Sequence, residues 1–266
     1  MFIFDIYLVL DIIRKERSFY LTVKSGICSI KNEFFESMSE TPEKSPSSWK
    51  GKRKPKSPIK FKISLNEEQK EAKATIMQKP VTVLRGAAGS GKTLLAVQVA
   101  LDLLFTREIE RIVITRPTVA KEDIGFLPGD LKEKMDPWLA PIYSNLYMLY
   151  DRAKIDQLIA EGIIEILPFP FMRGRTLVDS CVIVDEAQNV TMGQMEMAIG
   201  RLGVGSKIII CGDTSQIDLK NKKDSGLDFL NTIAARIDGV EVINLKKNHR
   251  HEIVPAVLDI YKEYSS

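Results

Sequence analysis

The sequence predicts an α/β fold: a mostly parallel sheet with helices on both of its faces. Short, fully apolar segments recur along the chain, and helical patterns separate most of them. Strands that are apolar along their whole length are typical of a parallel sheet buried on both sides. Their alternation with helices is the pattern of α/β domains. At 266 residues the chain has room for one large domain of this kind and an appendage.

The expected elements follow one another from residue 63. A capping box, Ser64-x-x-Glu67, predicts a helix that extends to about Gln78. Apolar runs predict strands at 81–84, 111–115, 163–167, 182–184, 207–211 and 239–245. Helical patterns predict helices at 94–101, in a proline-interrupted stretch at 131–153, and at 192–202 and 226–237.

A glycine-rich loop joins the first of these strands to its helix. It reads Gly86-Ala87-Ala88-Gly89-Ser90-Gly91-Lys92-Thr93 and fits G-x-x-x-x-G-K-[ST] at every position. Its glycines let successive backbone N–H groups approach phosphate oxygens, and the helix that follows adds its positive dipole end. We expect Lys92 to reach the β- and γ-phosphates and Thr93 to bind Mg²⁺. A glycine turn with a chance lysine would not explain the strand–loop–helix setting.

Two carboxylates follow the apolar run at 182–184. Because chemistry in parallel sheets gathers at the carboxyl ends of the strands, Asp185 is expected to face the glycine-rich loop. We expect Asp185 to hold Mg²⁺ through its water shell and Glu186 to orient and deprotonate an attacking water. An acidic pair at a strand end is common, so this interpretation depends on the neighbouring loop.

Two glutamines are further candidates. Gln216 follows the strand at 207–211 and could sense the γ-phosphate, or it could be a surface residue after a Gly-Asp turn. Gln69 precedes the loop by seventeen residues; its amide could pair with adenine and favour ATP, or it could simply be solvated.

Residues 1–62 are expected to form a largely flexible extension, and residues 63–266 the domain. The segment at 41–63 has eight basic residues and one acid, and its four prolines argue against regular structure. It is either a tether that lies on nucleic-acid phosphates or a solvated linker. The apolar N-terminus at 1–13 is too short and too acidic to span a membrane, so no membrane partner is expected. Three widely spaced cysteines, two of them in or beside apolar runs and expected to be buried, favour a reducing cytoplasm.

The ordered motifs resemble those of the RecA-like core of superfamily-one helicases, and more closely those of the PhoH-like family of ATPases. The resemblance covers about 63–264 and includes Leu245-x-x-Asn248-His249-Arg250, where His249 stands in place of the tyrosine of the helicase motif. The other matching strings are Thr115-Arg116-Pro117, Gly125-Phe126-Leu127-Pro128-Gly129-Asp130-Leu131-x-x-Lys134, Phe171-Met172-Arg173-Gly174-Arg175-Thr176-Leu177, Asp185-Glu186-Ala187-Gln188-Asn189 and Gly212-Asp213-Thr214-Ser215-Gln216.

The resemblance implies a single RecA-like P-loop NTPase domain in the cytoplasm that binds ATP and Mg²⁺ and hydrolyses ATP. It nominates Arg250 to face the γ-phosphate, and Arg116, Arg173 and Arg175 as functional basic positions. The alternative for Arg173 and Arg175 is structural pairing with acids such as Asp179. In some relatives the activity is linked to RNA unwinding and to ring-shaped oligomers.

A translocating helicase needs two ATPase lobes, and this chain has one, so a homo-oligomer with the site at its interface is expected. Contacts with RNA or single-stranded DNA are expected between 115 and 177, where basic residues occur with aromatic ones that could stack on bases or belong to the core. These residues are Arg116, Lys121, Arg173, Arg175, Phe126, Trp138, Phe169 and Phe171. Two other functions stay open: a small-molecule P-loop kinase, which would not need Glu186, and an ATP-dependent switch without hydrolysis.

Overall fold

A computed structural model describes residues 59–117 and 131–265. Within them, six strands form one sheet in the order β3-β2-β4-β5-β1-β6, and every adjacent pair is parallel. The strands are β1 (Val81–Arg85), β2 (Arg111–Arg116), β3 (Ile164–Pro168), β4 (Ser180–Val184), β5 (Lys207–Gly212) and β6 (Val240–Asn244). The predicted strands lie within three residues of these bounds, and the predicted fold class is confirmed.

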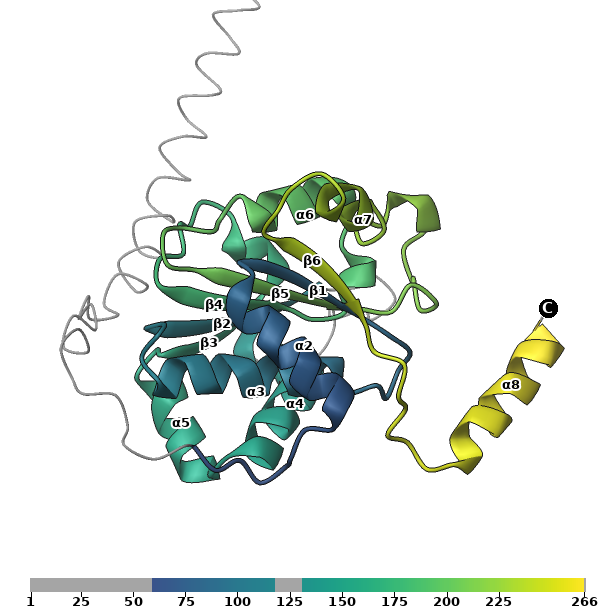
Figure 1. Cartoon of the computed structure of the whole chain (residues 1–266), viewed down its shortest axis with the longest axis horizontal. Coiled ribbons are helices and arrows are strands. Elements are labelled where there is room, and N and C mark those ends of the chain that lie inside the picture. The colour runs from purple at the N-terminus through teal and green to yellow at the C-terminus, as the bar shows by residue number, and fades with distance from the viewer. Residues whose placement is uncertain (1–58, 118–130, 266) are drawn as a thin grey trace, which may run out of the picture. The chain divides into compact units, whose positions relative to one another are not determined.

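Helices cover both faces of this sheet (Figure 1). One face carries α2 (Glu67–Gln78), α3 (Lys92–Phe105), α4 (Leu131–Leu149) and α5 (Arg152–Ala160). The other carries α6 (Met192–Ile199) and α7 (Phe229–Ala234). Three short 3₁₀ helices, η2 (Phe169–Met172), η3 (Ala187–Asn189) and η4 (Lys222–Asp224), lie in the connections. A last helix, α8 (Ile253–Ser265), was not predicted from the sequence.

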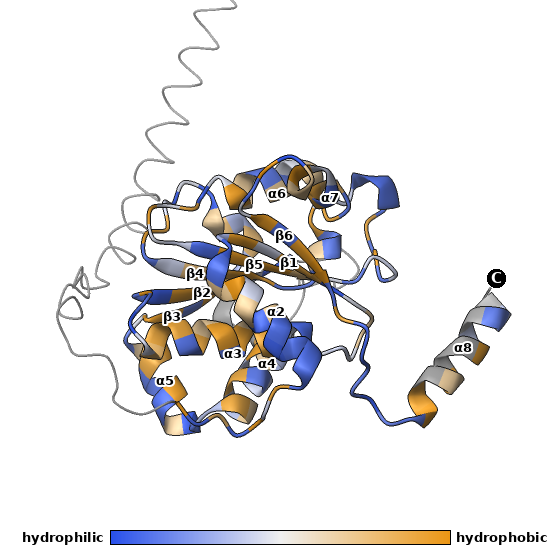
Figure 2. Cartoon of the chain, viewed as in Figure 1, coloured by the Kyte–Doolittle hydropathy of each residue, from blue (hydrophilic) through white to orange (hydrophobic). Residues whose placement is uncertain are grey.

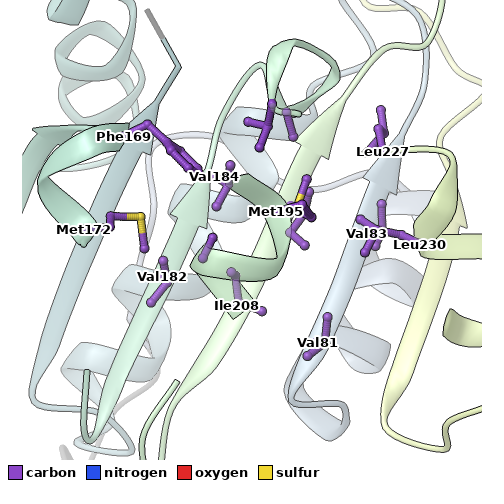
Figure 3. Packing of buried hydrophobic residues seen from close by; sticks show 14 of the residues in the cluster. Val81, Val83, Phe169, Met172, Val182, Val184, Met195, Ile208, Leu227 and Leu230 are labelled. Atoms are coloured by element: carbon purple, nitrogen blue, oxygen red, sulfur yellow. The ribbon is translucent and has the colours of Figure 1, made fainter. Parts of the chain in front are cut away.

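The core lies between the sheet and these helices. The strands and α3 are mostly hydrophobic, whereas α2 is largely hydrophilic (Figure 2). On the α6–α7 face, alternate strand residues such as Val83 and Val182 pack with Met195 and Leu230 (Figure 3). All five residues of β4 are buried, as expected for a central parallel strand. The core therefore fixes where the strands end, and with them the residues that follow.

The predicted capping box at the start of α2 is wrong. Asn66, not Ser64, is the N-cap: its side-chain oxygen accepts the backbone N–H of Gln69 at 2.9 Å, and the Gln69 Oε1 accepts the Asn66 N–H at 3.2 Å. The helix thus begins at Glu67, and Asn66-x-x-Gln69 makes the two reciprocal bonds of a capping box two residues later than predicted. Gln69, which was predicted to contact adenine, is thus also the N3 residue of α2 and part of its capping box.

Several predictions lie outside the described residues. These are the predictions for residues 1–58, including Cys28, for the motif positions 125–130, and for Lys121 and Phe126 as nucleic-acid contacts. The side chain of Trp138 is also outside the description. Lys62, counted in the basic segment, donates its ammonium to the carbonyls of Tyr147 (3.2 Å) and Tyr150 (2.9 Å) at the end of α4. Among the helices of the described ranges, none combines the length and the apolar character that crossing a membrane requires.

Candidate nucleotide-binding site

The glycine-rich loop joins β1 to α3 at the carboxyl edge of the sheet. Gly89 and Gly91 have φ of +87° and +80°, conformations that L side chains rarely adopt. A Cβ on Gly89 would lie 2.7 Å from the Arg250 Cγ, and one on Gly91 would lie 2.7 Å from the Gln69 Nε2. Glycine is therefore required both by the turn and by the side chains that pack directly on it.

Lys92, the first residue of α3, folds back over this loop. Its ammonium donates to the carbonyls of Gly86 at 2.7 Å and Ala87 at 3.1 Å. A lysine held there places a positive charge over the loop, at the end of a helix whose dipole also favours anions.

Thr93 connects the loop to β4. Its hydroxyl donates to the Asp185 Oδ1 at 2.6 Å, and the Asp185 backbone N–H is bound by the Thr115 carbonyl at 2.8 Å. Asp185 is 5% exposed, and burial raises the pKa of its carboxyl. The hydrogen bond from Thr93 and the nearby Arg116 oppose this shift, while Glu186 adds to it. A buried hydroxyl–carboxylate pair of this kind suits a hard cation, so the residues present fit Mg²⁺.

Within 59–117 and 131–265, no group of three or more His, Cys, Asp or Glu could hold a metal. Mg²⁺ in nucleotide sites is bound by one or two protein oxygens together with phosphates and waters, so a single carboxylate and a hydroxyl are sufficient.

Glu186 adopts an unusual backbone conformation for a residue with a side chain, with φ of +51° and ψ of +39°. Non-glycine residues in this region cost about 1–3 kcal/mol and are frequent at functional sites. Its carboxylate accepts the Gln188 Nε2–H at 2.6 Å and lies 3.6 Å from the Arg116 guanidinium. The backbone and two neighbours thus fix the direction of this acid.

Gln188 was not proposed as a site residue, although it lies in a motif string. It is 1% exposed and connects two strand ends: its Nε2 donates to Glu186, and its Oε1 accepts the Asp213 N–H at 3.0 Å. A polar residue after an apolar strand gives no signal of such a bridge, because its partner lies 25 residues away.

Asp213 in turn holds Gln216. Its Oδ2 accepts the Gln216 Nε2–H at 2.6 Å, and its Oδ1 accepts the N–H and the hydroxyl of Ser215. Burial pushes the pKa of Asp213 upward, but these three hydrogen bonds and the charge of Lys92 together outweigh it, and the net pKa is lowered. Gln216 therefore has a fixed position facing the same cavity as Lys92.

That cavity has a volume of about 190 Å³. Asn145 of α4 also lines it and has no sequence signal of its own; its Nδ2 donates to the Pro141 carbonyl at 2.9 Å. The residues that line the cavity are Gly91, Lys92, Thr93, Leu94, Asn145, Asp185, Glu186, Cys211, Gly212 and Gln216.

The segment after β6 lies on the glycine-rich loop. The Leu245 N–H donates to the Arg85 carbonyl at 2.7 Å, and the His249 N–H donates to the Gly89 carbonyl at 2.9 Å. The Arg250 N–H is bound by the Asn248 Oδ1 at 2.9 Å, and its side chain passes beside Gly89. Gln69 and Arg250, far apart in sequence, thus both contact the loop.

The structure separates the three arginines proposed for nucleic acid. Arg175 pairs with Glu165 at 2.6 Å, a structural role of the kind weighed above, with a different partner from Asp179. Arg116 pairs with Glu186 inside the site. Arg173 is exposed on the turn after η2, two positions after the exposed Phe171, whereas Phe169 is buried in the core.

The family model described as PhoH-like protein matches residues 62–262. The chain belongs to the PhoH-like family. The PhoH-like protein of Bacillus subtilis (strain 168) is 44% identical over 232 residues, which are 86% of this chain and 70% of that protein. The PhoH-like protein of Synechocystis is 44% identical over 197 residues, 73% of this chain and 60% of that protein. The protein PhoH of Escherichia coli (strain K12) is 40% identical over 168 residues, 62% of this chain and 48% of that protein.

This PhoH-like chain thus spans half to about two thirds of the length of these relatives. Among solved structures, the large terminase of a thermophilic bacteriophage matches with a TM-score of 0.48 and 11% identity, over 75% of this chain and 50% of that one. This likeness is too weak to say anything of activity. The family and the parallel sheet with its glycine-rich loop establish a RecA-like P-loop NTPase fold.

Proposed function

We propose that this PhoH-like protein binds ATP with Mg²⁺ and hydrolyses it. The observation that carries the proposal is the 2.6 Å contact between Thr93 and Asp185 in the cavity that Lys92 and Glu186 also line. When bound, Mg²⁺ would neutralise charge that develops on the phosphates. Thr93 and Asp185 are the residues that would hold it.

The other residues have roles that follow from their positions. Lys92 offers its ammonium to phosphate oxygens in place of the loop carbonyls it now binds. Glu186, oriented by Gln188, is placed to accept the proton of an attacking water, and Gln216, held by Asp213, is placed to orient that water. Arg250 lies beside Gly89, where its guanidinium can approach a terminal phosphate.

The test is phosphate release from ATP with and without single-stranded RNA. Lys92→Ala should abolish release, and Lys70→Ala, an exposed lysine on α2, should leave it unchanged. Glu186→Gln should retain nucleotide binding but lose release. Equal release by wild type and Lys92→Ala would contradict the site, and tight binding without release under any condition would indicate a switch instead.

We further propose that hydrolysis is coupled to RNA or single-stranded DNA at the carboxyl edge of β2 and β3. Arg173 and Phe171 support this, since both are exposed just after β3. The last residue of β3, Pro168, lies opposite Arg116 of β2 in the sheet. An aromatic face beside an exposed arginine suits a stacked base and its phosphate. Arg173→Ala should weaken binding of labelled single strands, while Arg236→Ala, an exposed arginine shortly before the start of β6, should not. Equal effects would contradict this location.

We also propose that the protein forms a homo-oligomer and that it acts in the cytoplasm. On α8, exposed apolar residues recur at helical spacing, namely Ile253, Val257, Ile260, Tyr261 and Tyr264. Such a stripe is typical of a helix that packs on a partner. Ile260→Asp should reduce the sedimentation coefficient, whereas Glu263→Ala on the same helix should not. Cys181 and Cys211 are buried free thiols, consistent with a reducing compartment.

A further inference from the structure

The imidazole of His249 is bound at one edge by two amides of α2 and its cap. The Asn66 Nδ2 lies 3.1 Å from the His249 Nε2, and the Gln69 Nε2 lies 3.5 Å from the same atom. His249 itself is exposed, while Gln69 is 5% exposed and packs on Gly91 of the phosphate loop. The contact thus connects the segment after β6 with the residue placed to read a base.

The helix cap fixes the orientation of both amides. Each side-chain oxygen already accepts a backbone N–H, Asn66 Oδ1 from Gln69 and Gln69 Oε1 from Asn66. Exchanging oxygen and nitrogen in either amide would set a donor against a donor. Both NH₂ groups must therefore face His249, and its Nε2 must be the acceptor, so a neutral ring carries its proton on Nδ1.

This arrangement matters for base recognition. The Gln69 amide retains one N–H and one oxygen lone pair beyond those used in the cap and at His249. An amide in a fixed orientation can donate to N7 of adenine and accept from its amino group, whereas guanine presents two acceptors on that edge. Holding the Gln69 amide in place is thus a way to favour adenine.

We propose that His249 is a positioning residue that holds Gln69 for adenine and thereby favours ATP over GTP. A side chain without an acceptor at this position would leave the NH₂ groups of Asn66 and Gln69 without this partner, and the Gln69 amide could then turn away from the base. The inference rests on the proposed nucleotide site.

The experiment compares dissociation constants for AMP-PNP and GMP-PNP, with Mg²⁺, for wild type and for variants at position 249. The ratio of the two constants removes effects on the phosphates, which both ligands share. Loss of the acceptor at position 249 should reduce the preference for AMP-PNP about two- to twelvefold, the effect of one hydrogen bond of about 0.5–1.5 kcal/mol. An unchanged ratio would overturn the inference.

The chain has two histidines, and the second provides a matched control. His251 is also exposed, and its Nδ1 accepts the Ile253 N–H at 3.4 Å. His251→Phe should keep the wild-type ratio. His249→Phe, which has no acceptor, should have the low ratio. His249→Gln, whose amide oxygen can accept, should keep the high ratio.

The outcomes separate this inference from the proposed function. If neither analogue binds to wild type, the nucleotide site itself is wrong and the inference falls with it. If AMP-PNP binds but selectivity depends on His251, or on neither histidine, the inference alone is overturned.

Discussion

The hydroxyl of Thr93 donates to the carboxylate of Asp185 across 2.6 Å, joining the start of α3 to the end of β4. The two residues are 92 positions apart, and α3 contacts both β5 and β4 as it connects β1 to β2, which brings its start to the end of β4. The candidate metal site is therefore a product of strand order, and its carboxylate is buried.

That burial predicts a stability effect. Burial raises the pKa of Asp185, so the folded protein binds this proton more tightly than the unfolded chain does. The cost of the charged form is absent below the unfolded pKa and grows as the pH rises toward the folded pKa. Asp185→Asn should therefore raise the melting temperature at about pH 7.5 without nucleotide or metal, and the gain should shrink at about pH 4.5. A lower melting temperature at the higher pH would contradict this account.

Asp213 should behave in the opposite way. Burial acts to raise the pKa of Asp213, but the hydrogen bonds from Ser215 and Gln216 prevail and lower it. Its contribution to the free energy of unfolding is therefore present above the unfolded-state pKa and is lost as the pH falls through the folded-state pKa. Asp213→Asn should destabilise the protein by about 1 kcal/mol at about pH 7, since hydrogen bonds to the charged group are weakened. Urea unfolding at about pH 7 and pH 3.5 measures the difference. An equal loss at both pH values would mean that the charge is not involved.

Glycine substitutions should distinguish strain from collision. Gly162 has φ of +67° and nothing within 4 Å of where a Cβ would lie, whereas a Cβ on Gly89 would lie 2.7 Å from Arg250 and 2.8 Å from Asn248. Gly162→Ala should cost about 1–2 kcal/mol through backbone strain alone. Gly89→Ala should cost more and also reduce binding of AMP-PNP. Calorimetric unfolding together with a binding titration separates the two effects. Equal losses of stability and unchanged AMP-PNP binding in both variants would show that the segment at 245–250 moves to accommodate the added methyl group.

Arg175 and Arg173 should have separable roles. Arg175 pairs with Glu165 at 2.6 Å, and the two side chains are 33% and 26% exposed. A double-mutant cycle with Arg175→Ala and Glu165→Ala should give a coupling of about 1 kcal/mol, the upper end for such pairs. Arg173→Ala should leave stability within about 0.5 kcal/mol, because the side chain is exposed. A coupling energy near zero would mean that the ion pair does not stabilise the fold, which would leave a nucleic-acid role open for Arg175.

Much of the fold followed from local pattern. Segments such as 207–211 are apolar over most of their length, and the phosphate loop needs only the strand before it and the helix after it. The position of Asp185 was also predicted correctly, because a carboxylate after a buried strand must emerge at its carboxyl edge. These predictions depend on residues close to one another in the chain.

The missed cap was a local choice, since Ser64-x-x-Glu67 and Asn66-x-x-Gln69 both suit a capping box and the structure uses the second. Other features that the sequence did not predict depend on residues far apart. Asn145 enters the cavity because α4 packs on α3, which no local pattern encodes. Helix α8 was missed although the sequence carries its signal, since Ile253, Val257 and Ile260 recur at helical spacing; only their exposure could not be predicted.

The chain from Leu245 to Arg250 is bound to the strand and loop beneath it near both of its ends and enters α8 three residues later. A rearrangement of the loop around a triphosphate that keeps these hydrogen bonds would therefore displace the start of the C-terminal helix through a very short connection. A fluorophore attached near Tyr264 would then report the nucleotide state of a site to which it has no direct contact.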